Sequence, residues 1–387
     1  MKTIVLLTNI LTPYRIYFYD LLSIYFKEEG IDFKVIVTSK TEPNRNWNYQ
    51  DFERDYTILS DGKILQLPNN IFIHINFNIK KLLETLQPDI VISAGTYLYP
   101  ALWTTLYNRR KLKYQVYYWS EAHLYEERNY SKMKFYLREK IRDFIFKKFD
   151  GFWYGGKLSL EFINKYSNKS AIKIFVPNLI DNDYFKTSLQ FNDNDKIALR
   201  IKYGVPDNRI IMICPARLTW VKGQLEFLKS FKYSIYKDKY FILFVGEGNM
   251  MNEISEFAKD MSCVKFLGYK DQNEMVELFS ISTILLLPSL SDPNPLTSIE
   301  ALWCGLSFLV SSNVGNYPEV VKEGENGFVF DYKNKISLDN ALYNFSKWDN
   351  SNFNDAFKVT FKIANSIYDS QIASKRIVKE LIFKSQL

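Results

Sequence analysis

Two carboxylates that follow a short apolar run have a spacing suited to ligand binding. Ile284–Leu287 is typical of a buried strand, and a helix is predicted to begin near Thr297. Asp292 then lies in the connecting loop and Glu300 in the first turn of the helix, so both can face one site. Unpaired N–H groups and the helix dipole make such a helix start an anion site. The free N–H groups are expected around Thr297 and Ser298, and Pro295 and Leu296, just before them, are also candidate donor-binding residues.

This combination suits a sugar nucleotide, with one carboxylate accepting hydrogen bonds from sugar hydroxyls and the other from ribose hydroxyls. Two cations strengthen the interpretation, because Arg217 and Lys222 follow another predicted strand, Ile210–Cys214. Two cations beyond a strand end can clamp a diphosphate and stabilise the charge that develops on it. The alternatives are that Ser298 and Glu300 only cap a helix and that both cations are solvated surface charges.

The elements that must position these residues alternate along the whole chain. Short apolar runs rich in β-branched residues are followed by amphipathic stretches, which is typical of parallel strands joined by crossover helices. The first half has predicted strands at Thr3–Thr8, Phe33–Thr38, Ile90–Ala94, Gln115–Trp119, Gly151–Tyr154 and Ala171–Val176. The second half has them at Ile210–Cys214, Tyr240–Val245, Val264–Leu267, Ile284–Leu287, Ser307–Val310 and Phe328–Phe330.

The two sets of strands predict two doubly wound α/β domains. Periodicity is lost between Val176 and Lys196, where Asn, Asp and Pro cluster, so the boundary is expected near residue 190. The predicted domains are residues 1–190 and 191–368, and a final helix over 369–387 has Ala373, Ile377 and Leu381 on one stripe. Ligands of such sheets bind beyond the carboxyl ends of the strands, so two facing domains are expected to form a cleft.

Composition excludes several classes of protein. The 387 residues, 47% of them hydrophobic, can fill two cores. A net charge of +7 is mild for this length and does not indicate nucleic-acid binding. The two histidines and three scattered cysteines form no metal-ligand motif. The first residues are typical of a strand rather than a signal peptide, and no apolar run reaches membrane-spanning length, so a cytoplasmic protein is expected.

The segment around the two carboxylates resembles glycosyltransferase family 4, the glycosyl transferases group 1, a large retaining family with the GT-B fold. The resemblance rests on Pro288-Ser289, Asp292, the Pro-Asn-Pro-Leu turn from Pro293 to Leu296, Glu300-Ala301 and Gly305. It continues through the Ser311–Phe330 loop and strand, which carries Gly315, Pro318, Glu319, Gly324 and Gly327. The sequence departs from the family at Asp292, where Glu is usual, and at Pro295, which supplies no N–H to the donor.

The resemblance implies roles for further residues. Arg217 and Lys222 would hold the donor diphosphate, Glu300 the ribose, and Asp292 and His123 the donor sugar. The residues that would line the donor pocket, including the base, are Gly246, Glu247, Gly268, Tyr269 and Lys270. In the first half, the Thr12 to Arg15 turn fits a subset of the family. The candidate acceptor-binding residues are Thr12, Arg15, Gly95 and Thr96.

The alternatives stay open for two of these residues. Arg15 at a helix start could meet an acceptor phosphate or form an intrahelical ion pair. A lone histidine is more often structural, but His123 lies just past the predicted strand Gln115–Trp119, and this position makes a functional role about equally expected.

The resemblance implies a retaining, metal-independent transfer of a sugar from a nucleotide diphosphate sugar, without a cofactor, to a glycan or lipid-linked acceptor. Surface polysaccharides such as capsule or O-antigen are the expected products. One rival is a catalytically silent subunit that binds a partner enzyme or glycan. A nucleotide-sugar epimerase of the same architecture is disfavoured by the motif spacings. A dinucleotide-dependent oxidoreductase is disfavoured because no GxGxxG follows the first strand.

The predicted helix over Lys132–Lys148 has a basic surplus. Seven basic residues against two acidic ones give 7 − 2 = +5. A basic amphipathic helix of this kind can rest on an anionic membrane, which would suit a lipid-linked acceptor. The alternative is a core helix with a solvated basic face.

Overall fold

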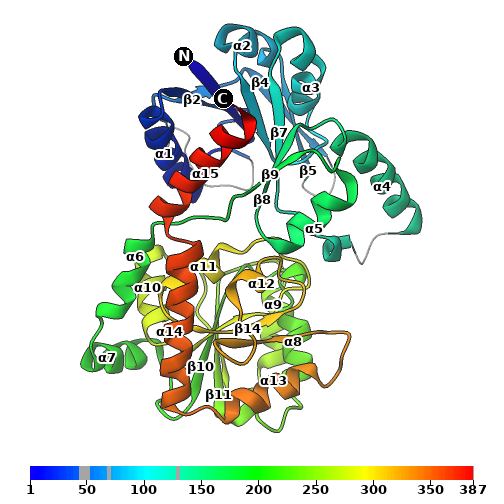
Figure 1. The fold of residues 1–387 in the computed structure, drawn as a ribbon. Coiled ribbons are helices and arrows are strands. Elements are labelled where there is room, and N and C mark those ends of the chain that lie inside the picture. Colours follow the sequence, from blue (N-terminus) through cyan, green and yellow to red (C-terminus); the bar gives the residue numbers. More distant parts are fainter. Residues whose placement is uncertain (43–52, 68–70, 128–130, 387) are drawn as a thin grey trace. The chain divides into compact units, whose positions relative to one another are not determined.

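The computed structural model describes residues 1–42, 53–67, 71–127 and 131–386. It divides into two compact units (Figure 1). The first unit comprises Met1–Glu121, Glu127–Ile180 and Ser370–Leu387, and the second comprises Ala122–Glu126 and Asp181–Asp369. Apart from the segment Ala122–Glu126, the second unit begins at Asp181, whereas the boundary was expected near residue 190.

The first unit is built on a seven-stranded parallel sheet with the strand order β3-β2-β1-β6-β7-β8-β9. Most of its strands are continuous apolar runs, because helices cover both faces of a parallel sheet. The strands are β1 (Lys2–Thr8), β2 (Ile31–Val37), β3 (Thr57–Leu59), β6 (Ile90–Ala94), β7 (Gln115–Ser120), β8 (Gly151–Tyr154) and β9 (Ile172–Phe175). A separate antiparallel pair is formed by β4 (Gly62–Leu67) and β5 (Ile71–Asn76).

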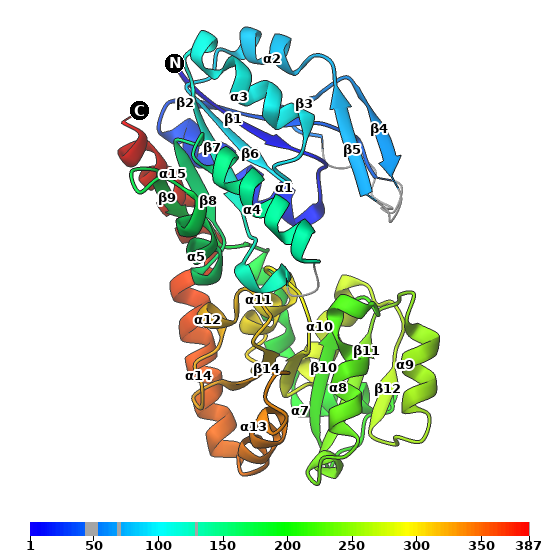
Figure 2. The same cartoon turned by 90° about the vertical axis from the view of Figure 1, so that its right-hand side faces the viewer.

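Helices pack around this sheet and close its core (Figure 2). They are α1 (Pro13–Glu28), α2 (Ile79–Leu86), α3 (Pro100–Leu112), α4 (Lys132–Phe146), α5 (Lys157–Tyr166) and α15 (Ser370–Ser385). The last of these contacts α1 and β9, although it follows the whole second unit in sequence. Its predicted apolar stripe, Ala373, Ile377 and Leu381, is buried in the core of the first unit.

The second unit has a six-stranded parallel sheet with the order β12-β11-β10-β13-β14-β15. Its strands are β10 (Ile210–Pro215), β11 (Tyr240–Val245), β12 (Val264–Phe266), β13 (Ile284–Leu287), β14 (Ser307–Ser311) and β15 (Gly327–Phe330). Its α-helices are α6 (Asn182–Lys186), α7 (Asp193–Tyr203), α8 (Gln224–Phe231), α9 (Met251–Ala258), α10 (Gln272–Ser280), α11 (Leu296–Trp303), α12 (Tyr317–Val320), α13 (Ser337–Ser346) and α14 (Asn350–Ile367).

All twelve predicted strands are present, which confirms the α/β interpretation with parallel sheets. The prediction missed β3 at the sheet edge and the β4–β5 pair. It also treated Val176–Lys196 as an irregular connection, whereas part of this segment folds as α6, the 3-10 helix η4 (Thr187–Gln190) and the start of α7. These elements are short, and the Asp and Asn residues interpreted as loop residues serve as caps, as Asp181 and Asn192 do for α6 and α7.

Both strand orders reverse once, which defines where each unit can bind a ligand. In the second unit the chain winds outward from β10 in one direction and then returns to start again at β13. In the first unit the same reversal lies between β1 and β6. Loops on the two sides of such a switch point diverge and leave a crevice beyond the carboxyl ends of the strands.

Candidate functional site

The switch point of the second unit carries most of the residues predicted to bind a donor. The loop after β10 holds Arg217 and Lys222, and the loop after β13 holds Asp292. The two loops are joined by backbone hydrogen bonds, because the N–H groups of Leu290 and Ser291 donate to the carbonyl of Val221 at 2.9 and 3.1 Å. The cations and the carboxylate are therefore held at one place by the fold.

Lys222 and Asp292 form an ion pair at this point. Nζ of Lys222 lies 2.5 Å from Oδ2 of Asp292, and the two side chains are 21% and 9% exposed. Opposite charges that are partly withdrawn from water interact more strongly than a surface pair does. The structure thus brings together a predicted diphosphate ligand and a predicted sugar ligand.

Gly223 follows the 3-10 turn that contains Lys222 and sets the path of the backbone after that turn. Its φ of +71° lies in the left-handed region, and a Cβ at this position would collide with the carbonyl oxygen of Pro288. Tyr332 holds that same carbonyl by donating its hydroxyl hydrogen at 2.7 Å. The loop after β13 is thereby fastened from two sides.

The Asp292 loop also rests closely on the loop after β14. The N–H of Gly315 donates to the carbonyl of Asp292 at 2.7 Å, and a Cβ on Gly315 would collide with the carbonyl oxygen of Pro293. Glycine is therefore required at 315 by close backbone approach.

Arg217 is exposed and enters no ion pair with the residues that the structure describes. Its backbone is held in place, because Nε2 of the buried Gln224 donates to its carbonyl at 3.1 Å. A fixed backbone with an available guanidinium is what a diphosphate ligand requires.

Helix α11 presents its N-terminus beside the same loop, with Pro295 as N-cap and no capping side chain. Ser298 is fully buried, and its hydroxyl donates to the carbonyl of Pro295 at 2.7 Å. Nδ2 of Asn316 donates to that hydroxyl, also at 2.7 Å. The side chain of Ser298 is thus committed to the turn, and its contribution to a ligand is limited to the backbone N–H.

Glu300 is the fifth residue of α11, just beyond the first turn in which the sequence interpretation placed it, and it is partly exposed. Burial raises the pKa of its carboxyl to about 7. In the described part of the chain no hydrogen bond to this carboxylate is formed, so its acceptor capacity is available to hydroxyl groups. A carboxyl with a strongly shifted pKa beside an anion site is typical of a functional position.

Three loops beyond β10, β11 and β12 are joined to one another. Gly246 donates its N–H to the carbonyl of Gly268 at 2.7 Å, and Leu218 donates to that of Glu247 at 2.9 Å. Tyr269 extends into solvent, whereas Lys270 pairs with Glu274 at 2.8 Å. The residues predicted to line a base pocket therefore share one edge of the sheet.

His123 lies in the short segment that groups with the second unit. Its ring is buried, and Nδ1 accepts a hydrogen bond from the N–H of Tyr125 at 3.3 Å. A Cβ at Gly315 would lie 2.9 Å from the ring's Cδ2.

In the first unit Arg15 pairs with a residue that the sequence interpretation did not consider. Its guanidinium lies 3.0 Å from Oε1 of Glu121 and 4.0 Å from the centre of the Trp119 ring. Burial lowers the pKa of Arg15, but the nearby Glu121 carboxylate outweighs this and raises it overall. The expected intrahelical ion pair is not the one observed here, because Glu121 follows β7 and lies outside α1.

The other acceptor candidates follow strands on either side of this unit's switch point. Thr12 is the N-cap of α1, after β1. Gly95 and Thr96 follow β6 and are exposed, and the Gly95 carbonyl accepts a hydrogen bond from the Tyr118 hydroxyl at 2.6 Å.

A buried polar cluster at the same edge was missed. Nδ1 of His74 lies 2.8 Å from the hydroxyl of Thr38, its Nε2 lies 3.3 Å from Glu42, and Asn9 donates to Glu42 at 3.0 Å. The only available signal was that Asn9 and Thr38 follow strands, because His74 comes from β5, which was not predicted.

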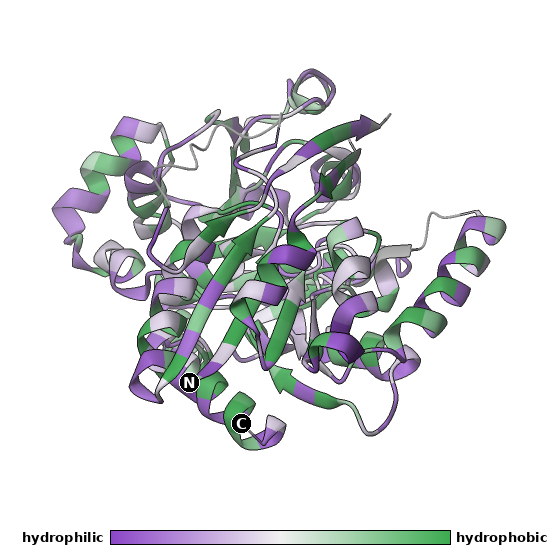
Figure 3. Ribbon diagram, turned by 90° about the horizontal axis from the view of Figure 1, so that it is seen from above, coloured by the Kyte–Doolittle hydropathy of each residue, from purple (hydrophilic) through white to green (hydrophobic). Residues whose placement is uncertain are grey.

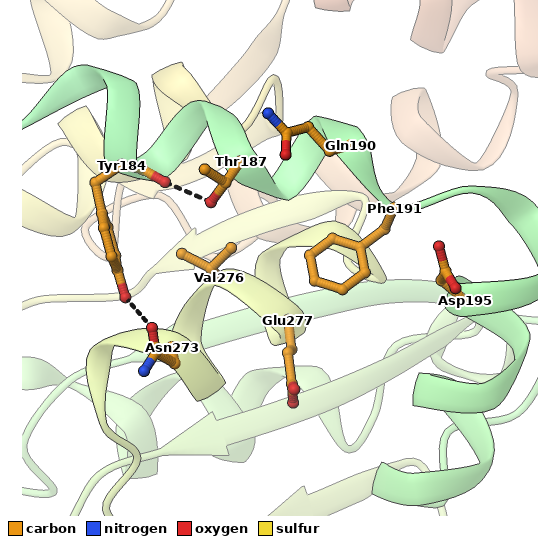
Figure 4. Close-up of a pocket in the computed structure, with 8 residues that line it drawn as sticks. All are labelled: Tyr184, Thr187, Gln190, Phe191, Asp195, Asn273, Val276 and Glu277. Atoms are coloured by element: carbon orange, nitrogen blue, oxygen red, sulfur yellow. Dashed lines mark hydrogen bonds between the residues drawn. The ribbon is translucent and has the colours of Figure 1, made fainter.

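A pocket of about 430 Å³ lies elsewhere in the second unit and contains none of the predicted residues (Figure 4). Tyr184 donates to Oδ1 of Asn273 across it at 2.6 Å, and Phe191 and Val276 supply apolar surface. Glu277 is engaged by Lys202 at 2.6 Å. The pocket lies where α6 and η4 pack on α10, and we assign it no role in ligand binding.

Solved structures share the fold of this chain. Solved structures of GT-B proteins superimpose on the entire chain; the Anabaena protein HepE, in complex with UDP and glucose, does so with a TM-score of 0.72, 15% identity and full coverage of both chains. A likeness at this identity establishes the fold. The protein has the GT-B fold, with two Rossmann-like units.

Residues 195–352 match the family model of glycosyl transferases group 1. A galactosyltransferase of Escherichia coli, UDP-Gal:alpha-D-GlcNAc-diphosphoundecaprenol alpha-1,3-galactosyltransferase, is 29% identical over 175 residues, which is 43% of either chain. The N-acetyl-alpha-D-glucosaminyl L-malate synthase of Bacillus anthracis is 28% identical over 158 residues, 40% of this chain and 39% of the relative. The chain thus spans about two fifths of the length of these relatives. The match to the group 1 model lies within the second unit and covers most of it.

Proposed function

We propose that the protein is a glycosyltransferase that moves a sugar from a nucleotide diphosphate sugar to a hydroxyl of a growing glycan. The observation that carries the proposal is the placement of Lys222 and Asp292, 2.5 Å apart, at the switch point of the second unit. The names of the group 1 relatives support it, since they include a sugar-nucleotide-dependent galactosyltransferase.

Binding of the donor is assigned to three kinds of group. Lys222 and Arg217 face the diphosphate, and the free N–H groups at the start of α11 add dipole and hydrogen bonds. Glu300 accepts hydrogen bonds from the ribose hydroxyls, and Asp292 and His123 orient the donor sugar. These cations and the helix end supply the charge stabilisation that a metal ion would otherwise give, so we propose a metal-independent reaction.

The transfer is proposed to retain the anomeric configuration. The bond between the anomeric carbon and the diphosphate oxygen breaks, and the acceptor oxygen bonds to that carbon on the same face. The acceptor proton passes to the departing diphosphate, so no protein base is needed. Lys222 and Arg217 stabilise the negative charge that the diphosphate gains.

The acceptor is proposed to bind the switch point of the first unit, between the α1 start and the loop after β6. The Arg15 guanidinium, stacked on Trp119, supplies a cation there for a phosphate-bearing acceptor. A lipid-linked intermediate of a bacterial surface polysaccharide, such as capsule or O-antigen, fits this chemistry, and the E. coli relative's name specifies a diphosphoundecaprenol acceptor.

Among the residues that the structure describes, none of the helices is both long enough and apolar enough to cross a bilayer. We propose a cytoplasmic enzyme that works peripherally at the inner face of the plasma membrane.

The proposal is tested by incubating the protein with UDP-, GDP-, ADP- and other activated sugars. One donor is expected to raise the melting temperature and, with acceptor, to release free nucleotide. The coupling constant of the new anomeric proton reports retention. Stabilisation by a donor with no nucleotide release under any acceptor would instead support the rival function, a silent subunit that binds sugar nucleotides without turning them over.

A further inference from the structure

Helix α4 (Lys132–Phe146) exposes a row of apolar side chains to solvent. Met133, Tyr136, Leu137 and Phe144 are 80%, 64%, 59% and 58% exposed. Their spacing of three, four and seven residues places them on one stripe of the helix. Figure 3 shows hydrophobic and hydrophilic turns alternating along this helix, which follows the grey trace on the right of the view.

The opposite face of α4 packs against the rest of the first unit, and this packed face contains a charged residue. Arg142 is only 3% exposed, and its Nε donates to the hydroxyl of Tyr97 at 3.2 Å. Its guanidinium lies 4.9 Å from the centre of the Phe162 ring. A helix on a water-facing surface buries its apolar stripe and exposes its charges. In α4, Ile145 and Phe146 are buried in this way, but a second apolar stripe faces outward.

Lysines border the exposed stripe. The ammonium of Lys140 lies 5.4 Å from the Tyr136 ring, and that of Lys148, just beyond the helix, lies 4.1 Å from the Phe144 ring. Long lysine side chains can lie along apolar surface while the charged ends reach water or headgroups. Apolar side chains among lysines on one face are typical of a helix that lies in a membrane interface.

A groove of about 540 Å³ opens beside this stripe, between α4 and α5. Its acidic residues are already neutralised, since Glu139 pairs with Lys165 at 2.9 Å and Asp143 with Lys147 at 2.7 Å. Lys132 and Lys140 also line it, and neither forms an ion pair with the residues that the structure describes. The groove therefore presents two available ammonium groups to an anion.

We propose that α4 lies flat on an anionic phospholipid bilayer, with its exposed stripe among the acyl chains and the α4–α5 groove holding a lipid phosphate. The inference deepens the peripheral association proposed above and does not depend on sugar transfer. It identifies the attachment surface, the groups that insert and the headgroup chemistry.

The observations favour a bilayer over a second copy or a protein partner. Residues 132–148 carry +5, so two copies of this surface would repel each other. Cores of protein interfaces are depleted in lysine, whereas basic residues near an anionic leaflet each add to binding.

Flotation of the full chain with phosphatidylglycerol vesicles, compared with phosphatidylcholine vesicles, tests the proposal without any sugar nucleotide. We expect binding to the anionic vesicles at low salt. The pair Lys132→Glu and Lys140→Glu should weaken it by about tenfold or more, and the pair Met133→Ser and Leu137→Ser by roughly tenfold. Two matched controls should bind like the wild type: Lys27→Glu, on α1, and Ile201→Ser, an exposed apolar residue on α7. Circular dichroism verifies that each variant is folded.

Three outcomes would overturn the inference. One is no flotation with anionic vesicles at low salt. Another is flotation that neither pair of substitutions reduces. The third is a dimer that the Met133→Ser and Leu137→Ser pair dissociates, in a chain that does not float. Inorganic phosphate should compete only weakly with the vesicles for the α4–α5 groove. If phosphate saturates the groove and no vesicles bind, the groove is a site for a free anion instead. Because vesicle binding is measured without donor, a failed transfer assay leaves this result unaffected.

Discussion

The ammonium of Lys222 lies 2.5 Å from the carboxylate of Asp292, across the point where the strand order of the second unit reverses. We assign the same ammonium to the donor diphosphate. The carboxylate and the phosphate therefore compete for one cation, and binding of a donor requires Lys222 to exchange one anion for the other. Asp292 becomes available to the donor sugar when that exchange takes place.

This competition predicts an unusual pair of effects for Asp292→Asn. Nucleoside diphosphate should bind at least as tightly as it does to the wild type, because a charge that repels it and occupies Lys222 is gone. Turnover should fall by about tenfold to a hundredfold, because the sugar loses a charged acceptor of its hydroxyl groups. Calorimetric titration and nucleotide release measure the two effects. Asp292→Glu, which keeps the charge, is the matched control and should retain most turnover. Weaker nucleotide binding by Asp292→Asn would refute the competition.

The raised pKa of Glu300, about 7, predicts a pH-dependent stability. The folded protein holds this proton more firmly than the unfolded chain does. The contribution of the Glu300 carboxyl to the free energy of unfolding is therefore present at low pH and is lost as pH rises from about 4.5 through 7. The loss is on the order of 2 kcal/mol, after a discount for partial exposure. Glu300→Gln lacks this ionisation. Its melting temperature should therefore exceed that of the wild type increasingly from pH 5 to pH 8; parallel pH curves for the two proteins would contradict the account.

Gly223→Ala should move the Lys222 loop. The residue would need a φ of +71°, and its Cβ would collide with the Pro288 carbonyl. We expect a stability loss of about 1 to 3 kcal/mol and a higher KM for the donor, with little change in the KM for the acceptor. Thermal unfolding and steady-state kinetics measure these effects. Gly324→Ala is the control: its φ is +76°, but no atom lies near its Cβ. Equal effects of the two changes on donor KM would show that the Pro288 contact is irrelevant to the site.

Arg15→Lys should separate the stacking role of Arg15 from its charge. Lysine keeps the pair with Glu121 within reach but loses the planar contact with Trp119. Stability should fall by about 1 kcal/mol. If the acceptor binds here, the acceptor KM should rise severalfold while the donor KM stays constant. A rise in donor KM alone would place Arg15 outside the acceptor site.

The parallel strands were predictable because they are strongly patterned. Runs such as Ile284–Leu287 and Tyr240–Val245 are apolar on both faces, which few other elements require. The β4–β5 pair was missed because Gly62–Leu67 does not alternate strictly between polar and apolar residues, although the sequence Pro68-Asn69-Asn70 that follows it is a turn signal. The short helices after Ile180 were missed because one or two turns of helix give no periodicity to detect.

The strands that precede the candidate residues were predictable, but most of the pairings between these residues were not. Lys222 and Asp292 are 70 residues apart, and only the sheet order brings their loops together. Arg15 and Glu121 are 106 residues apart for the same reason. Ser298 lies at the expected helix start, but its buried hydroxyl donates to the carbonyl of Pro295 and is not available to a ligand. The sequence alone does not reveal this hydrogen bond.

The most direct test of the donor site is the affinity of the full chain for UDP, GDP and ADP, measured by calorimetry for the wild type, Lys222→Ala and Lys229→Ala. Lys229 is a matched control, an exposed lysine of the same unit that pairs with Glu226 at 2.8 Å. We predict that one nucleoside diphosphate binds the wild type and Lys229→Ala alike, and that Lys222→Ala binds it about ten- to a hundredfold more weakly. Binding that Lys222→Ala leaves unchanged, or no binding of any nucleoside diphosphate by the wild type, would contradict the account.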